Sequence, residues 1–316
     1  MKRREFLAGS AAALALGLAN AQAIPAPASL TSFKLGVITD EVSQDLEKAL
    51  VWAKGFGLEW VELRFVWGKY VTDFTKEEVG KARDLLSEFA MRVSVVDSAY
   101  CKTNLPGTQS KFADPKDDPL QSDFAAQDAL LERAMARAKD FKAEKVRIFS
   151  FLRVPEPKKV FDRVAKELAR SAELADREQI KLVLENEFSC NVATGAESAA
   201  MLAAVKSSSL GLNWDPGNAY AAGELKPYPD GYAPLDKSRL WHMHLKDAQE
   251  NSTGRESVWR PIGGGKIDYP GQFRALIKDG YSGTMSLETH YLNSAGDKSA
   301  SSTESLQGMQ SLLAKL

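Results

Sequence analysis

Residues 181–215 read KLVLENEFSCNVATGAESAAMLAAVKSSSLGLNWD, and this stretch holds one complete unit of the fold. Its first five and its last five residues are short runs of the kind that form buried strands. Residues 196–205, which lie between these runs, have a helical pattern. A strand that leads through a helix to a second strand predicts a parallel βαβ unit.

The same alternation continues over the rest of the chain, at about thirty residues per unit. The strand candidates are 33–39, 60–64, 92–97, 146–151, 181–185, 211–215, 240–246 and 283–288. The helical patterns are 46–56, 76–89, 124–141, 157–177, 196–205, a short piece near Tyr232, 270–278 and 304–316. Eight strands that alternate with helices favour an α/β fold, a closed (β/α)8 TIM barrel in a single domain over residues 24–316, rather than an open doubly wound sheet.

Three long loops, 98–122, 216–238 and 247–267, follow strands at their carboxyl ends. Barrels of this kind build their active sites from such loops. The segment 294–302 is small and polar, which predicts a solvated linker to the last helix.

Residues 1–23 predict a cleavable export signal, which we leave out of the fold. A basic start precedes an apolar stretch, 7–19, that is short for a membrane span, and Ala21-Gln22-Ala23 is a small-residue ending. Arg3-Arg4 adds a twin-arginine signature, although the pair lacks a preceding Ser or Thr. We therefore expect export to the periplasm, by the twin-arginine route or by the general secretory one.

The chain without this signal has 293 residues, 38 basic and 41 acidic side chains, and a formal charge of −3. A nearly neutral, slightly acidic surface argues against a nucleic-acid partner. No second apolar run approaches the length of a membrane span, so we expect no stable membrane insertion. Cys101 and Cys190 are too few for a disulfide framework, and their spacing leaves open whether they pair.

Four side chains with metal-binding chemistry stand at the ends of successive late strands: Glu185, Asp215, His244 and Glu288. The intervals between them are 30, 29 and 44 residues, and the loop 247–267 accounts for the longest. Because the carboxyl ends of barrel strands meet at one rim, these side chains would converge. Three carboxylates and one imidazole suit one divalent ion, such as Mn, Mg, Co or Zn. Any one acidic residue at a strand end could instead be a helix cap or an ion-pair partner.

The chain resembles the xylose isomerase-like TIM barrels, and within them the sugar phosphate isomerase/epimerase family. The motifs that carry the resemblance are Leu184-Glu185-Asn186, Asp215-Pro216-Gly217-Asn218, HMHLKD at 242–247, PIGGGKID at 261–268 and Ser286-Leu287-Glu288. The resemblance implies that Glu185, Asp215, His244 and Glu288 bind the metal. It also implies that Glu185 and Glu288 flank the substrate carbon, and homo-oligomers are common in the family.

The chemistry of this arrangement is consistent with proton abstraction beside a carbonyl group. A metal on the carbonyl and hydroxyl oxygens of a sugar stabilises the enediolate that forms when a C–H proton leaves. Glu185 and Glu288, on opposite sides of the ion, could then act as the catalytic base and acid.

Five further residues are candidates for substrate binding: Glu62, Lys246, Asn218, Trp214 and His242. Glu62 lies on the second strand and resembles a substrate-facing position of the family, although an ion pair with a group such as Arg64 explains it equally. Lys246 could meet a substrate oxygen or pair with Asp247. His242 precedes His244 by two residues, so it lies on the same strand face one layer deeper, which is more typical of a supporting or core histidine than of a ligand.

Aromatic residues at the rim, among them Trp214 and Trp259, could stack on sugar faces, although each one alone is more typical of packing. The ketohexose epimerases of the family have a His, a Glu and an Arg where this chain has Asn218, Asn191 and Glu250. A free ketohexose is therefore a doubtful substrate. Export argues against a phosphorylated sugar, so we expect an unphosphorylated sugar, a keto-sugar or a glycoside.

The first functional hypothesis is a metal-dependent sugar isomerase or epimerase. A lyase or dehydratase acting on a keto-sugar or a 3-keto-glycoside would begin with the same proton abstraction, and the ligand set alone does not separate the two. A non-catalytic sugar-binding barrel would require a degraded metal site. A three-zinc DNA-repair endonuclease needs more histidines than His242, His244 and His290, and a basic surface.

Overall fold

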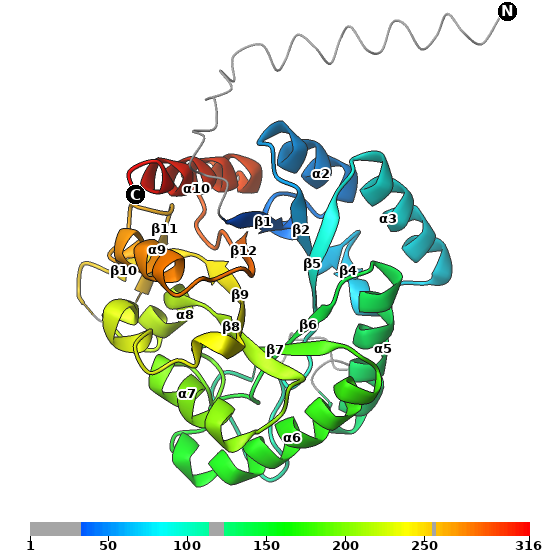
Figure 1. Ribbon diagram of the computed structural model, residues 1–316, viewed down its shortest axis with the longest axis vertical. Coiled ribbons are helices and arrows are strands. Elements are labelled where there is room, and N and C mark those ends of the chain that lie inside the picture. The colour runs from blue at the N-terminus through cyan, green and yellow to red at the C-terminus, as the bar shows by residue number, and fades with distance from the viewer. Residues whose placement is uncertain (1–32, 114–122, 255–256) are drawn as a thin grey trace, which may run out of the picture.

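Eight parallel strands close into a barrel in the computed structural model, which describes residues 33–113, 123–254 and 257–316 (Figure 1). The strands are β1 (Lys34–Ile38), β2 (Trp60–Leu63), β5 (Arg92–Asp97), β6 (Lys145–Ile148), β7 (Lys181–Glu185), β8 (Leu210–Trp214), β9 (Leu240–Leu245) and β12 (Thr284–Leu287). They follow one another round the barrel in chain order, and β1 pairs with β12 to close it. The predicted single-domain (β/α)8 TIM barrel is confirmed. The expected export signal, 1–23, lies outside the described residues.

Helices surround the barrel on its outer side (Figure 1). They are α2 (Leu46–Gly55), α3 (Lys76–Glu88), α5 (Gln127–Asp140), α6 (Phe161–Arg177), α7 (Gly195–Ala204), α8 (Pro216–Ala221), α9 (Tyr269–Lys278) and α10 (Lys298–Leu313). Short helical turns lie at η2 (Thr39–Glu41), η3 (Val71–Asp73), η4 (Phe124–Ala126), η5 (Pro157–Lys159), η6 (Pro227–Gly231) and η7 (Lys237–Arg239). Capping boxes begin α3 and α7, because Thr75 and Thr194 each exchange hydrogen bonds with the glutamate three residues later. No helix among these described segments has both the length and the apolar character of a membrane span.

The long loops contain more regular structure than the sequence predicted. The segment 247–267 holds an antiparallel hairpin, β10 (Asp247–Glu250) with β11 (Ser257–Arg260), and a second small hairpin pairs β3 (Phe65–Val66) with β4 (Lys69–Tyr70). The segment 216–238 begins with α8, a helix that the sequence pattern did not predict. The Asp215-Pro216 pair could have revealed it, because Asp215 caps the helix and proline suits its first turn.

The prediction of a solvated linker over 294–302 was wrong for its second half. Helix α10 already begins at Lys298, capped by Asp297, whose side chain accepts from the Ala300 N–H. Ser301 and Ser302 are buried, and the Ser302 hydroxyl donates to the carbonyl of Glu41. Small polar residues therefore pack here, because their hydroxyls find backbone acceptors.

The interior of the barrel is polar near the carboxyl ends of its strands. Glu62, Asp97, Arg147, His242 and His244 are all buried there. Buried ionisable groups are costly unless they pair with one another, so this interior points to a function rather than to stability.

Candidate metal centre

Glu185, Asp215, His244 and Glu288 meet at one point of the barrel rim. One donor atom from each lies within 4.8 Å of the donor atoms of the other three, and all four residues are buried. Glu185 ends β7, His244 lies in β9, and Asp215 and Glu288 directly follow β8 and β12. The structure thus brings together the four side chains that the strand spacing predicted to converge. Three carboxylates and one imidazole fit a single divalent ion.

The Asp215 carboxylate is positioned by the turn that begins α8. Its Oδ1 accepts from the Asn218 N–H at 2.9 Å, which leaves Oδ2 free to face the other donors. The side chain of Asn186 bonds both the N–H and the carbonyl of Asp215, at 2.7 and 2.8 Å. Asn186 therefore positions Asp215. The sequence predicted no such role for it, although it belongs to the Leu184-Glu185-Asn186 motif.

Lys246 lies between two of the four donors. Its ammonium is 3.0 Å from Asp215 Oδ2 and 2.5 Å from Glu288 Oε2. Gly217 is required beside it, because a Cβ there would lie 2.3 Å from Lys246 Cγ. The alternative that Lys246 pairs with Asp247 is wrong, because Asp247 instead accepts from the N–H groups of Gly263 and Gly265. Contact of Lys246 with a substrate oxygen stays a prediction.

Two arginines, for which the sequence predicted no role at the metal centre, each bind one carboxylate oxygen of the two glutamates. Arg147 Nη1 donates to Glu185 Oε2 at 2.9 Å, and Arg64 Nη1 donates to Glu288 Oε1 at 2.7 Å. The interpretation that Glu62 forms an ion pair with Arg64 is therefore wrong. Arg147 also lies 3.3 Å from Asp97 Oδ2. One carboxylate oxygen of each glutamate therefore accepts from an arginine, and the other faces the remaining donors of the cluster.

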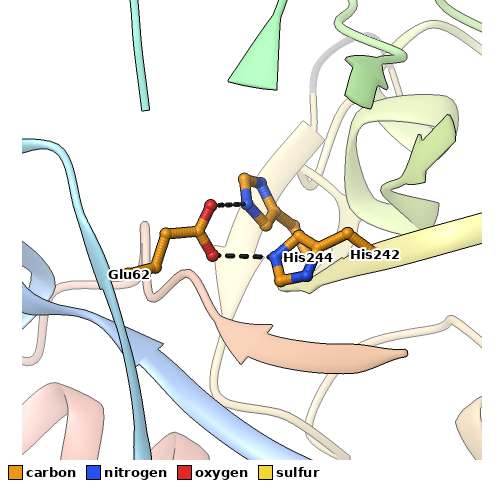
Figure 2. Close-up of side chains that lie close together, drawn as sticks. All are labelled: Glu62, His242 and His244. Carbon is orange, nitrogen blue, oxygen red and sulfur yellow. Dashed lines mark hydrogen bonds and ion pairs between the residues drawn. The ribbon is translucent and has the colours of Figure 1, made fainter. Parts of the chain in front are cut away.

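Glu62 is buried in the barrel and accepts hydrogen bonds from two histidines (Figure 2). Its carboxylate accepts from Nε2 of His242 at 2.8 Å and from Nε2 of His244 at 2.9 Å. With Nε2 protonated, His244 turns Nδ1 to Glu185 Oε1 and Glu288 Oε2, each 3.2 Å away. Burial alone would lower the pKa of His244, but the neighbouring carboxylates raise it well above its ordinary value, so the ring is positively charged. Because Glu62 holds the Nε2 proton, Nδ1 is the nitrogen that would lose its proton to accept a metal ion.

This arrangement corrects the prediction that Glu62 and His242 bind substrate. Both side chains are fully buried inside the barrel, and each is the hydrogen-bond partner of the other. His242 does lie one layer deeper than His244, as strand geometry predicted. Neither side chain lines the cavity that Glu185 and Glu288 line.

Trp214 is also wrongly predicted as a substrate contact. It is fully buried, and its indole N–H donates to Gln272 of α9 at 3.3 Å. Successive side chains of a strand point to opposite faces, so the inward position of Asp215 turns Trp214 outward to the helices.

The three positions that differ from the ketohexose epimerases are occupied by internal contacts. The amide of Asn191 donates to the carbonyls of Ser150, Phe151 and Leu152. The amide of Asn218 donates to Glu185 Oε1 at 2.9 Å, and Glu250 accepts from the Tyr220 hydroxyl. Asn218 therefore supports a metal-type donor, and Asn191 holds a loop in place.

The charges around the cluster control which carboxylates are ionised. Burial alone would raise the pKa of Glu185, but the positive charges of His244 and Arg147 lower it to about 2. Burial raises the pKa of Asp215 to about 7, against the opposing charge of Lys246. At neutral pH Glu185 is thus ionised, whereas Asp215 carries a proton in part of the molecules.

A cavity of about 300 Å³ opens above the donors. Both glutamates of the cluster line it, together with Arg64, Tyr70, Lys102, Arg147, Phe149, Glu187, Phe188, Ser189, Trp259 and His290. Its volume is at the lower end of the range for small-molecule sites. Trp259, one of the predicted rim aromatics, comes from the hairpin strand β11.

Residues 50–312 match the family model described as a xylose isomerase-like TIM barrel. The chain belongs to that family. The resemblance predicted from the motifs is thereby confirmed. No curated protein matches this xylose isomerase-like barrel in sequence.

Several solved structures share the fold of this xylose isomerase-like barrel. The IolI protein with a bound zinc atom has a TM-score of 0.67 and 16% identity, over 90% of this chain and 99% of its own. A xylose isomerase-like TIM barrel protein from Mycobacterium smegmatis, in complex with magnesium, has a TM-score of 0.62 and 17% identity, over 91% and 99%. D-allulose 3-epimerase from Methylomonas sp., in complex with D-allulose, has a TM-score of 0.61 and 18% identity, over 89% and 97%.

Replacement of Glu62 by Gln is expected to weaken divalent metal binding by about 10- to 100-fold. Glutamine keeps the shape of the side chain, but it offers only one acceptor oxygen to two imidazole N–H groups, so the His244 tautomer is no longer held. Titration calorimetry with Mn²⁺ measures the change. Glu59→Gln, at an exposed position three residues earlier, is the matched control, and equal affinities for the two variants would contradict the positioning role of Glu62.

Proposed function

We propose that this barrel is a divalent-metal-dependent isomerase or epimerase that acts on an unphosphorylated sugar or keto-sugar. The observation that carries the proposal is the convergence of four possible metal ligands, two of which, Glu185 and Glu288, line a small cavity. The family match is consistent with it, as are fold relatives that hold zinc, magnesium or D-allulose. The ion is Mn, Mg, Co or Zn, held by Glu185, Asp215, His244 and Glu288.

A divalent ion at these donors would supply a Lewis acid beside the carbonyl and hydroxyl oxygens of the sugar. The chain supplies the proton transfers. Glu185, which is ionised at neutral pH, accepts the proton from the carbon next to the carbonyl. Glu288 faces the same cavity and exchanges a proton at the substrate from its own side of the cluster. Which glutamate begins depends on the configuration of the sugar.

The positive charges of the cavity support the enediolate. Arg64 and Arg147 line the cavity while they hold Glu288 and Glu185, so negative charge that develops on the substrate oxygens meets two guanidiniums. Lys102 adds a third cation there. Because a carboxylate with a low pKa is a weak base, these cations must make the substrate C–H bond more acidic, to which an ion held by the four donors would contribute.

A lyase or dehydratase that acts on a keto-sugar or 3-keto-glycoside is the second candidate. It would use the same first step and then expel a leaving group. A second cavity, which shares Phe188 with the first, favours this candidate. A glycoside carries both a second ring that could occupy this cavity and a leaving group. A non-catalytic sugar-binding barrel would not need four intact donors.

We also propose that the protein is exported to the periplasm, on the basis of the export signal expected in residues 1–23. This location is the reason for proposing an unphosphorylated carbohydrate. A homo-oligomer is proposed on the family resemblance alone.

Metal analysis and proton NMR in heavy water test the proposed function. We expect about one divalent ion per chain in the purified protein. We also expect metal-dependent exchange of a sugar C–H for deuterium when keto-sugars and keto-glycosides are screened. Isomerisation moves or exchanges the proton at constant composition, whereas elimination splits or dehydrates the substrate. Stoichiometric metal without any exchange over the screen would contradict the enolisation chemistry.

A further inference from the structure

A second cavity lies beside the one above the metal donors, and the ring of Phe188 lines both. The inner cavity has a volume of about 300 Å³ and the outer one about 420 Å³. We propose that the outer cavity is a subsite for the second ring of a glycoside, whose reacting sugar lies in the inner cavity. The proposal rests on the proposed function and names its substrate class. A sugar or an aromatic aglycone could supply this ring, because both are joined through a glycosidic oxygen.

A row of aromatic rings leads from the metal donors to the outer cavity. His290 Nε2 is 3.2 Å from Glu288 Oε1, and the His290 ring meets Trp259 edge-on with centroids 5.2 Å apart. The Trp259 and Phe188 centroids are 6.5 Å apart, and those of Phe188 and Phe112 are 6.1 Å apart. Such rings offer large, rigid contact areas to a bound ring system. The row thus provides one wall from the reacting centre outward.

The outer cavity suits a neutral ring better than an anionic group. Its other walls are largely apolar and include Val154, Pro155 and the small side chains of Ala221 and Ala222. Two cations, Arg153 and Lys111, line it too. The Arg153 guanidinium already donates to both oxygens of Glu197 and to the carbonyl of Cys190, and the Lys111 ammonium lies over the Phe112 ring, 4.9 Å from its centroid. A largely apolar pocket whose arginine is paired with a glutamate and whose lysine covers an aromatic ring suits a neutral ring with an aromatic or sugar face.

Helix α8 gives the distance between the two subsites. Asp215, a metal-type donor, caps its first turn, and Ala221 and Ala222 line the outer cavity at its other end. Six helical residues span about 9 Å. One sugar ring held at the donors does not cover this span, whereas two linked rings do.

Binding of one-ring and two-ring probes to the Mg²⁺-loaded protein tests the subsite. The one-ring probes are D-glucose and D-galactose; the two-ring probes are cellobiose, lactose and the 4-nitrophenyl β-glycosides of both sugars. We expect at least one two-ring probe to bind about tenfold or more tightly than its one-ring counterpart in calorimetry or saturation-transfer NMR. A preference for disaccharides or for nitrophenyl glycosides identifies the second ring as a sugar or an aromatic group. If no two-ring probe binds better than its one-ring counterpart, the proposal is overturned.

Two variants test whether the outer cavity is the place where the second ring binds. Phe112→Ala removes an aromatic wall and Ala222→Trp fills the cavity, and each is expected to abolish most of the two-ring advantage while one-ring binding changes less than about twofold. Phe56→Ala, at a half-buried phenylalanine that lines neither cavity, is the matched control. An unchanged two-ring advantage in both variants overturns the assignment.

Deuterium exchange of the keto-sugars and keto-glycosides of the screen, measured on the same protein preparations, separates this proposal from the proposed function. A two-ring advantage that Phe112→Ala removes, without any exchange, supports the subsite and counts against the isomerase chemistry. Exchange with one-ring sugars, without any two-ring advantage in binding, supports the isomerase chemistry and overturns the subsite.

Discussion

Glu185→Gln is expected to lower the rate of substrate proton exchange by about 10²- to 10⁴-fold, and Glu288→Gln by a similar factor. Glutamine preserves the volume and an acceptor oxygen, but the amide does not take a proton from carbon at neutral pH. The two glutamates line the cavity and lie in the donor cluster, so each substitution acts at the reacting centre. Exchange is measured by NMR in heavy water with the substrate that the screen identifies.

Loss of metal must be separated from loss of the base in these variants. Metal content is therefore measured on every sample, and rates are compared at saturating metal. Glu132→Gln, on the exposed side of α5, is the control for a simple change of charge. Exchange that persists in both Glu185→Gln and Glu288→Gln would remove the acid and base assignment while leaving the metal site in place.

Arg147→Met is expected to lower the free energy of unfolding of the metal-free protein by about 3–5 kcal/mol. Arg147 is buried with Glu185, and methionine fills its volume without its charge. Burial raises the pKa of Asp97 well above its ordinary value against the charge of Arg147, so the main uncompensated charge is that of Glu185. Urea denaturation with a chelator present measures the loss.

The same substitution is expected to cost less when metal is bound. A divalent ion at Glu185 supplies part of the positive charge that Arg147 provides, so unfolding curves with saturating Mn²⁺ should differ less between variant and parent. Arg177→Met, at an exposed arginine at the end of α6, is the control and should change stability by less than about 0.5 kcal/mol. A loss for Arg147→Met as small as that of the control would argue against the ion pair.

The fold and the donor cluster were predictable because both depend on local pattern and on one spacing rule. Strand and helix patterns predicted the barrel, and the carboxyl ends of its strands brought Glu185, Asp215, His244 and Glu288 together. The outward position of Trp214 could also have been foreseen, since it precedes the inward-facing Asp215 by one residue.

The supporting contacts were not predictable in the same way. Arg64 and Arg147 pair with glutamates 224 and 38 residues away, and such pairs depend on the register of strands and on the reach of long side chains. The depth of Glu62 depends on where β2 lies against its neighbours. Its partner His242 was predicted as a deeper residue, but no sequence feature joined the two.

The closure of the barrel has a consequence for the assembly of the candidate metal centre. Strand β1 pairs with β12, the final strand, and Glu288 follows β12 directly. Without β12 the strand order has no pair that closes it, and only three of the four donors are present. If the four donors hold a cation as proposed, the complete ligand set exists only after the last strand has closed the barrel.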